Sequence, residues 1–164
     1  MERILALLKE ANTKLNTADH LAYVTYPMLK ESKLLIATMD NLYQSLSLAI
    51  ESLLEYERYY KRISFVPIDF NQKFDMFKKI SVRYNMDRIA ISSLLDIKSL
   101  LETHKKSSMV FTREQKLVIA TQGFKVVKTL NIENVKRYIE QTKPILAKIN
   151  KVIIPNASPT RRFA

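Results

Sequence analysis

The 164-residue chain contains no cysteine, one glycine and two histidines. Without cysteine it forms neither disulfides nor cysteine-based zinc sites, and this absence fits a reducing compartment. Phosphate-binding loops need several glycines, so Gly123 alone cannot build one. A di-iron bundle needs paired Glu-x-x-His motifs, but Thr17 and Leu101 stand three residues before His20 and His104. The sequence therefore predicts no metal, no cofactor and no catalytic residue, and it favours a binding protein over an enzyme.

Long apolar runs are also absent. The longest stretch without charge covers residues 41–50, and it includes Asn, Gln and Ser, so it is too short and too polar to span a membrane. Residues 1–16 carry a charge every few positions and lack the apolar core of about 7–15 residues that defines a signal peptide. We therefore expect a cytoplasmic protein with no membrane partner.

Glycine and proline are too scarce for many turns. One glycine and five prolines favour long helices with short connections over a many-stranded fold. The length and the apolar content of 47% fit one domain with a substantial core. We predict a mainly α fold, an antiparallel bundle of about five helices with a small β-hairpin near 116–130. The domain is expected to cover 1–152, and 153–164 is predicted to be a flexible basic tail.

Apolar residues at helical spacing mark five segments, which cover residues 2–25, 33–62, 71–83, 87–105 and 132–152. Pro27 is expected to end the first segment, because proline disfavours α-helical backbone in the residue before it. Pro144 lies inside the last segment and is expected to kink that helix. The stretches 63–70 and 106–115 are predicted to be connections. Short polar side chains at expected N-cap positions are Asn71, Asn131 and either Asn85 or Asp87.

The segment 33–62 is predicted to be the central helix of the bundle. It carries a seam of apolar residues at alternating steps of four and three, formed by Leu35, Met39, Leu42, Leu46, Ala49, Leu53, Tyr56 and Tyr60. A second line beside the seam repeats every seven residues and contains Ile36, Tyr43 and Ile50. Two apolar lines predict neighbours on more than one side of the helix.

Residues 116–130 contain Gly123 and six β-branched residues in fifteen. One helical face would hold Leu117, Ala120, Phe124 and Val127. The residues 117–119 and 124–127 also fit two short strands around a turn. Glycine adopts a positive φ freely in a hairpin loop, whereas inside a helix it costs ~1 kcal/mol relative to alanine. Because β-branched residues also favour strands, the hairpin is preferred, and the helix remains the alternative.

The net charge of +11 is concentrated near the C-terminus. Residues 1–104 carry 14 Lys and Arg against 13 Asp and Glu, whereas residues 105–164 carry 13 against 3. A near-neutral bundle over 1–105 is thus followed by a basic hairpin and last helix over 106–152. Such a localised excess indicates a polyanionic partner.

The basic third is predicted to contact nucleic acid through its phosphates, without an evident means of reading sequence. The predicted contact residues are Lys105, Lys106, Arg113, Lys116, Lys125, Lys128, Lys136, Arg137, Lys143, Lys148, Lys151, Arg161 and Arg162. The stretch 55–62, EYERYYKR, is a weaker candidate, because Tyr56 and Tyr60 belong to the predicted core seam. Nucleic-acid contact there would fall to Tyr59 with its basic neighbours.

Residues 6–26 and 42–56, ALLKEANTKLNTADHLAYVTY and LYQSLSLAIESLLEY, resemble the opening of HEPN-type helical domains, of the kind seen in uncharacterised archaeal proteins. The shared pattern is Ala-x-x-x-Leu-x-x-Ala, here Ala11, Leu15 and Ala18. The resemblance covers about residues 1–105 and implies two antiparallel helices that pack together.

Some HEPN proteins are ribonucleases that depend on an Arg-x-x-x-x-His motif. Here Ser99 stands five residues before His104, and Leu15 stands five residues before His20, so the motif is missing. The resemblance thus implies a non-catalytic member that binds a nucleotide, RNA or a partner.

Three functions follow as expectations. The first is a non-enzymatic binding protein whose basic C-terminal third contacts RNA or a ribonucleoprotein. The second is a HEPN-like ribonuclease or toxin-system component. The third is a protein-interaction module that forms a homodimer through an apolar face of the bundle.

Overall fold

The computed structural model describes residues 1–157 and confirms a mainly helical fold with a small antiparallel sheet. Its elements are α1 (Glu2–His20), a π-helical turn (Leu21–Thr25), α2 (Tyr26–Leu29), α3 (Lys33–Tyr59), α4 (Phe70–Arg83), α5 (Arg88–Lys105), β1 (Met109–Arg113), β2 (Lys116–Ala120), a 3₁₀ turn (Gln122–Phe124), β3 (Val127–Leu130) and α6 (Ile132–Ala157). Because α1, the π turn and α2 are continuous, the described chain has five helical segments. The predicted contact residues Arg161 and Arg162 lie outside the described residues.

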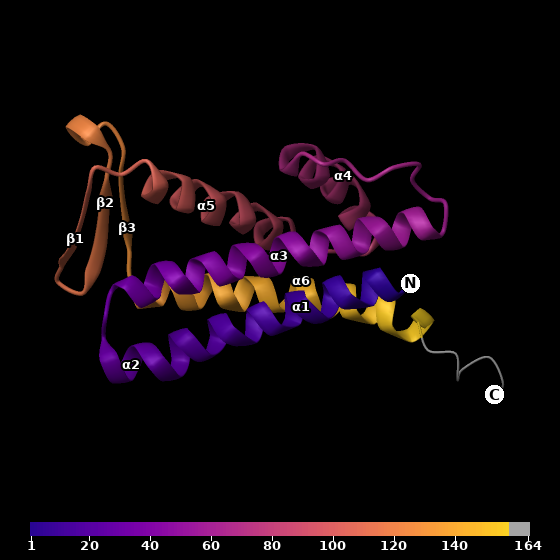
Figure 1. Ribbon diagram of the computed structural model, residues 1–164, viewed down its shortest axis with the longest axis horizontal. Helices are drawn as coiled ribbons and strands as arrows, with labels where there is room; N and C mark the ends of the chain where they lie inside the picture. Colours follow the sequence, from indigo (N-terminus) through magenta and orange to yellow (C-terminus); the bar gives the residue numbers. More distant parts are fainter. Residues whose placement is uncertain (158–164) are drawn as a thin grey trace.

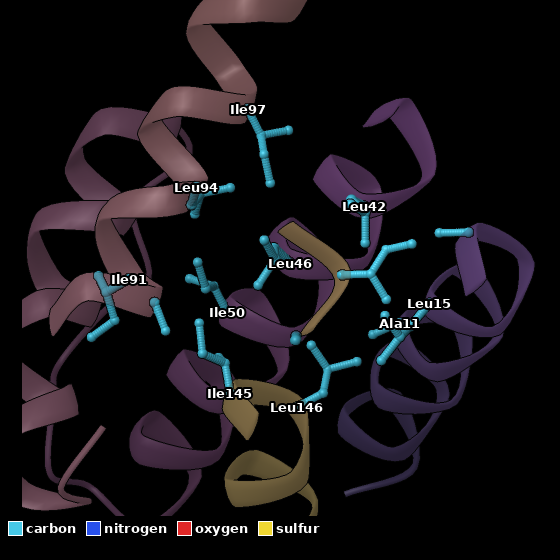
Figure 2. Packing of buried hydrophobic residues seen from close by; sticks show 14 of the residues in the cluster. Ala11, Leu15, Leu42, Leu46, Ile50, Ile91, Leu94, Ile97, Ile145 and Leu146 are labelled. Atoms are coloured by element: carbon cyan, nitrogen blue, oxygen red, sulfur yellow. The ribbon is translucent and has the colours of Figure 1, made fainter. Parts of the chain in front are cut away.

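Helix α3 is the central element, as the two apolar lines predict. It contacts α1 and α6 and also α4 and α5 (Figure 1). Leu46 and Ile50 lie between side chains of α5 and α6 (Figure 2). The predicted seam is buried from Leu35 to Tyr56, but Tyr60 is 41% exposed, so its assignment to the core was wrong. Tyr60 follows the last residue of α3, and its ring lies at the surface against Tyr56 and Arg62.

The first helix does not end at Pro27. Proline has no N–H and its ring crowds the carbonyl four residues earlier. The chain widens into a π-helical turn just before it, and Tyr26 N–H bonds the carbonyl of Leu21, five residues back. The helix then continues to Leu29 and stops at Lys30, whose backbone is left-handed (φ 50°). The π turn therefore accommodates the proline that was expected to break the helix.

Two of the predicted N-caps are confirmed and one is wrong. Asp87 accepts a hydrogen bond from Ile89 N–H at 2.9 Å, and Asn131 accepts one from Asn134 N–H at 2.8 Å. The cap of α4 is Asp69, not Asn71. Asp69 binds the free N–H of Gln72, which is the usual geometry of an N-cap.

Helix α6 passes Pro144 and continues to Ala157, so residues 153–157, which were expected to belong to the tail, are helical. The fully buried side chain of Ile153 explains the extension, because it continues the apolar face formed by Leu146 and Ile149.

The predicted hairpin exists, but the sheet has a third strand. β2 pairs with β3 around the loop 121–126, and β1 pairs with β2 on the other side, in the order β1-β2-β3. The stretch 106–115 was predicted to be a connection, and most of it is β1 and its turn. Inter-strand hydrogen bonds with β2 stabilise β1, although all five of its residues are exposed.

Gly123 serves the turn as predicted, with φ 71° and open space where a Cβ would stand. Gly123→Ala is therefore expected to lower the free energy of unfolding by about 1 kcal/mol, since only the left-handed backbone is strained. Gly123→Asn should lower it less, because asparagine tolerates this conformation better. Urea unfolding of the two variants measures the difference. Equal losses of unfolding free energy in Gly123→Ala and Gly123→Asn would contradict a purely conformational role of Gly123.

Candidate nucleic-acid interface

The sheet packs against the bundle with one face only. Paired residues of neighbouring strands lie on the same face, and successive residues alternate between faces. Leu117 and Ile119 of β2 are buried, and so is Leu130 of β3, which pairs with Leu117. This inner face contacts α5, where Lys128 Nζ donates to the hydroxyl of Ser99.

The outer face of the sheet is apolar, and its edge residues are exposed although Ala120 at its centre is buried. The register places Met109 and Phe111 of β1 beside Ala120 and Val118 of β2, and Val127 of β3 pairs with Ala120. Met109 is 48% exposed, Phe111 39% and Val127 49%. A cluster of exposed apolar side chains on one face of a sheet marks an interaction site more often than a free surface.

Basic side chains lie at both ends of this outer face. Arg113 and Lys116 are directly paired beside the β1–β2 turn, and both are exposed. At the other end, Lys125 lies in the β2–β3 loop, and Lys105 and Lys106 lie at the end of α5, separated from β1 by Ser107 and Ser108. Residues 105–131 carry six Lys and Arg and one acidic residue. The face is thus an apolar strip between two groups of cations.

The loop between β2 and β3 presents a second aromatic ring. Thr121 closes the loop, because its hydroxyl accepts from Val126 N–H at 3.0 Å and its own N–H donates to the carbonyl of Val126 at 3.0 Å. Inside it Phe124 has φ 54° and is 59% exposed. A non-glycine residue held in left-handed backbone stores strain, and such strain concentrates at functional positions.

The remaining predicted contact residues are divided between internal contacts and other surfaces. Lys128 binds Ser99 on the inner side of the sheet, and Lys148 Nζ donates to the carbonyl of Asn85. Arg137 is exposed on α6. Lys151 lines a separate cavity at the far end of α6. The structure therefore places Arg113 and Lys116 on the outer face and Lys105, Lys106 and Lys125 near its other end, and it does not bring the others there.

Lys136 and Lys143 take part in a surface cluster around Tyr23. Their Nζ atoms lie 5.0 and 5.6 Å from the centre of the Tyr23 ring. Lys143 also lies 2.8 Å from Asp19 and 3.2 Å from Glu140, and these contacts raise its pKa. Two carboxylates therefore already compensate the positive charge of Lys143, which makes it a poor candidate for contact with a phosphate.

The arginines of the stretch 55–62 are paired with carboxylates. Arg58 lies 2.6 Å from Glu55, and Arg62 lies 2.9 Å from Glu57. Tyr59 is 56% exposed. Both arginines therefore have carboxylate partners within this stretch, and the predicted nucleic-acid contact of Tyr59 stays a prediction.

The described residues 1–157 hold no group of three His, Asp or Glu side chains arranged for a metal ion. Within the same residues, no helix is both long and apolar enough to cross a membrane. His20 Nδ1 lies 3.4 Å from the hydroxyl of Thr25, and Asp19, its neighbour in sequence, pairs with Lys143 instead.

Comparisons of this chain with protein families, with curated proteins and with solved structures give no match. The resemblance to HEPN-type domains therefore stays a prediction.

The apolar residues of the interface were missed in the sequence. In MVFTR, residues 109–113, every side chain is exposed, so the burial that usually produces alternation is absent. One signal was available: two aromatic residues, Phe111 and Phe124, lie among the basic residues of the last third. Aromatic and basic side chains together are typical of surfaces that bind single-stranded nucleic acid.

Proposed function

We propose that the outer face of the sheet binds single-stranded RNA without strong sequence preference. The observation that carries the proposal is the apolar strip containing Phe111, with Arg113 and Lys116 at one end and Lys125 at the other. Unstacked bases can pack on Phe111 and Phe124, while the cations contact phosphates. The short strands of the sheet, five residues in β1, offer about 17 Å of contact along their length, room for a few nucleotides.

The chemistry of the face favours single strands over duplexes. In a duplex the flat faces of the bases are stacked, so exposed phenylalanine rings have nothing to pack on. The outer face also has few donors and acceptors, since Thr129 is the polar uncharged member of the strands there. Direct reading of base edges requires such groups. Stacking and phosphate contact without sequence reading are therefore expected.

The salt dependence of binding tests this proposal. Fluorescence anisotropy with a labelled oligoribonucleotide should show log K falling linearly with log salt. Replacing Arg113 and Lys116 by glutamine should reduce the steepness of the slope by about 1.4, which is about 0.7 for each lost phosphate contact with a single strand. Lys9→Gln with Lys79→Gln removes the same charge from two exposed positions on α1 and α4. An equal effect of that control pair would contradict binding at the sheet.

The open edge of β1 favours a second candidate function. In the part of the chain that the structure describes, β1 pairs on one side only. Unpaired edge strands can add a strand from a second copy. That pairing would make a homodimer through the sheet, and light scattering would then give twice the 19.1 kDa mass of one chain. A monomer at micromolar concentration would rule this candidate out.

A further inference from the structure

A second charged cluster lies at the opposite end of α3 from the sheet (Figure 1). Its centre is Glu57, whose side chain is fully buried. Arg62 donates to both carboxylate oxygens, from Nε at 2.9 Å and Nη2 at 3.2 Å. Arg83 Nη1 donates to Oε2 at 2.7 Å, and the Tyr84 hydroxyl donates to Oε1. One carboxylate thus fixes two guanidinium groups from different parts of the chain.

The carboxylate stays ionised in this setting. Burial raises the pKa of Glu57, but the hydrogen bonds from Arg62 and Tyr84 and the charges of Arg62 and Arg83 outweigh it, so the pKa lies below its usual value. Arg62 is also held by the rings of Tyr56 and Tyr60, at 5.5 and 5.2 Å from their centres. Side chains fixed in this way keep their remaining N–H groups oriented before any ligand arrives.

The two arginines border a shallow cavity of about 420 Å³. Its lining is Tyr56, Arg62, Arg83, Tyr84, Lys151 and Val152. Lys151 comes from α6, is exposed, and makes no ion pair within residues 1–157. Arg62, Arg83 and Lys151 carry three positive charges, and the carboxylate of Glu57 compensates one of them. The surroundings of the cavity therefore have an excess of two positive charges. Arg62 alone already donates to both carboxylate oxygens of Glu57, so compensating this buried charge requires neither Arg83 nor Lys151.

We propose that this cavity binds the phosphate group of a phosphomonoester. A guanidinium group offers two parallel N–H donors that match phosphate oxygens, and lysine adds a point charge. A phosphomonoester carries close to two negative charges at neutral pH, which matches the excess charge of the cavity. The volume is at the lower end of the range for ligand pockets, about 300–1,000 Å³. The phosphate belongs either to a small free phosphomonoester or to the end of a nucleic-acid strand.

Titration calorimetry of the full chain at low salt tests the proposal. The probes are inorganic phosphate, adenosine monophosphate, and one oligoribonucleotide with either a 5′-phosphate or a 5′-hydroxyl. Lys151→Gln should raise the dissociation constant about tenfold, the loss expected for one charge-assisted hydrogen bond. Lys151 makes no described ion pair, so this variant should fold normally. Lys30→Gln, at an exposed position between α2 and α3, removes the same charge and should leave the constant unchanged.

The outcomes separate the two sources of the phosphate. Saturable binding of phosphate or of the mononucleotide, weakened by Lys151→Gln, supports a small free ligand. Tighter binding of the 5′-phosphorylated strand than of the 5′-hydroxyl strand, with the difference abolished by the same variant and no binding of phosphate or the mononucleotide, supports a strand end. No saturable binding of phosphate or the mononucleotide together with equal affinity for the two strands, or an unchanged constant for Lys151→Gln, would overturn the proposal. Phe111→Ala alters the sheet alone and should leave the titrations with phosphate and adenosine monophosphate unchanged, so a failure of RNA binding at the sheet can be distinguished from a failure of this proposal.

Discussion

Glu57→Gln is expected to lower the free energy of unfolding by about 3 kcal/mol, which is the lower end of the range for breaking a buried ion pair. Glutamine keeps the size of the side chain but removes the charge that holds Arg62 and Arg83. Both arginines are partly exposed, at 38% and 55%, so water recovers some of their solvation and the loss stays near that lower end. Urea unfolding followed by circular dichroism measures the change.

The control for this variant is Glu102→Gln. Glu102 is 56% exposed and lies 3.7 Å from Lys98 on the same helix. Exposed pairs of this kind contribute about 0.3–0.5 kcal/mol. A loss for Glu57→Gln no larger than that of Glu102→Gln would contradict the central role assigned to the buried carboxylate.

The same carboxylate makes stability depend on pH in the acid range. The folded pKa of Glu57 is depressed below its ordinary value. Its contribution is therefore fully present above the unfolded pKa, about 4.3, and is lost as the pH falls through the lower folded pKa. The wild-type chain should lose stability through this acid range more steeply than Glu57→Gln does. Parallel curves for the two proteins would contradict the depressed pKa.

The helices could be predicted from the sequence because their burial is periodic. Leu35, Met39, Leu42 and Leu46 repeat at the spacing of one helical face, and each is buried. The scarcity of glycine and proline pointed to the same fold class. The exact helix ends were less predictable. The first helix continues past Pro27 because a π turn, a local adjustment of the backbone, accommodates the proline.

Strand β1 could not be predicted for two physical reasons. Its five residues are all exposed, so they carry no alternation of apolar and polar side chains. Its turn to β2 contains Glu114 and Gln115 with φ 51° and 64°, where hairpins usually place Asn and Gly. The turn conformation is present, but the Asn and Gly residues that usually indicate it in a sequence are absent. The position of the candidate interface therefore became visible only in the structure.

The buried carboxylate carried a signal that is clear in retrospect. Glu57 lies three, four and seven residues after Leu54, Leu53 and Ile50, which are all buried, so helical spacing places it on an apolar face. Its partners could not be predicted, because Arg83 and Tyr84 come from α4 and its C-cap, 26 and 27 residues later. Spacing along a helix shows that a charge is buried, but it does not show which part of the chain compensates it.

The double variant Phe111→Ala with Phe124→Ala is expected to weaken RNA binding on the order of a hundredfold. Stacking of one base on an aromatic side chain contributes about 1–3 kcal/mol, and every 1.4 kcal/mol is a factor of about ten. Two rings that each contribute about 1.4 kcal/mol, a value within that range, give the expected loss. Fluorescence anisotropy with the labelled oligoribonucleotide, at one fixed salt concentration, measures it. The slope of log K against log salt should stay as in the wild type, because no cation is removed.

Phe65→Ala is the matched control, since Phe65 is 58% exposed and lies in the connection between α3 and α4, away from the sheet. It removes the same ring and should leave the affinity unchanged. Phe111→Leu and Phe124→Leu keep apolar area without a ring, so they separate stacking from general apolar contact. If leucine restores wild-type affinity, the face binds through apolar area alone. If the alanine pair weakens binding no more than Phe65→Ala does, the sheet is not the RNA-binding surface, and the affinity must come from cations elsewhere on the chain.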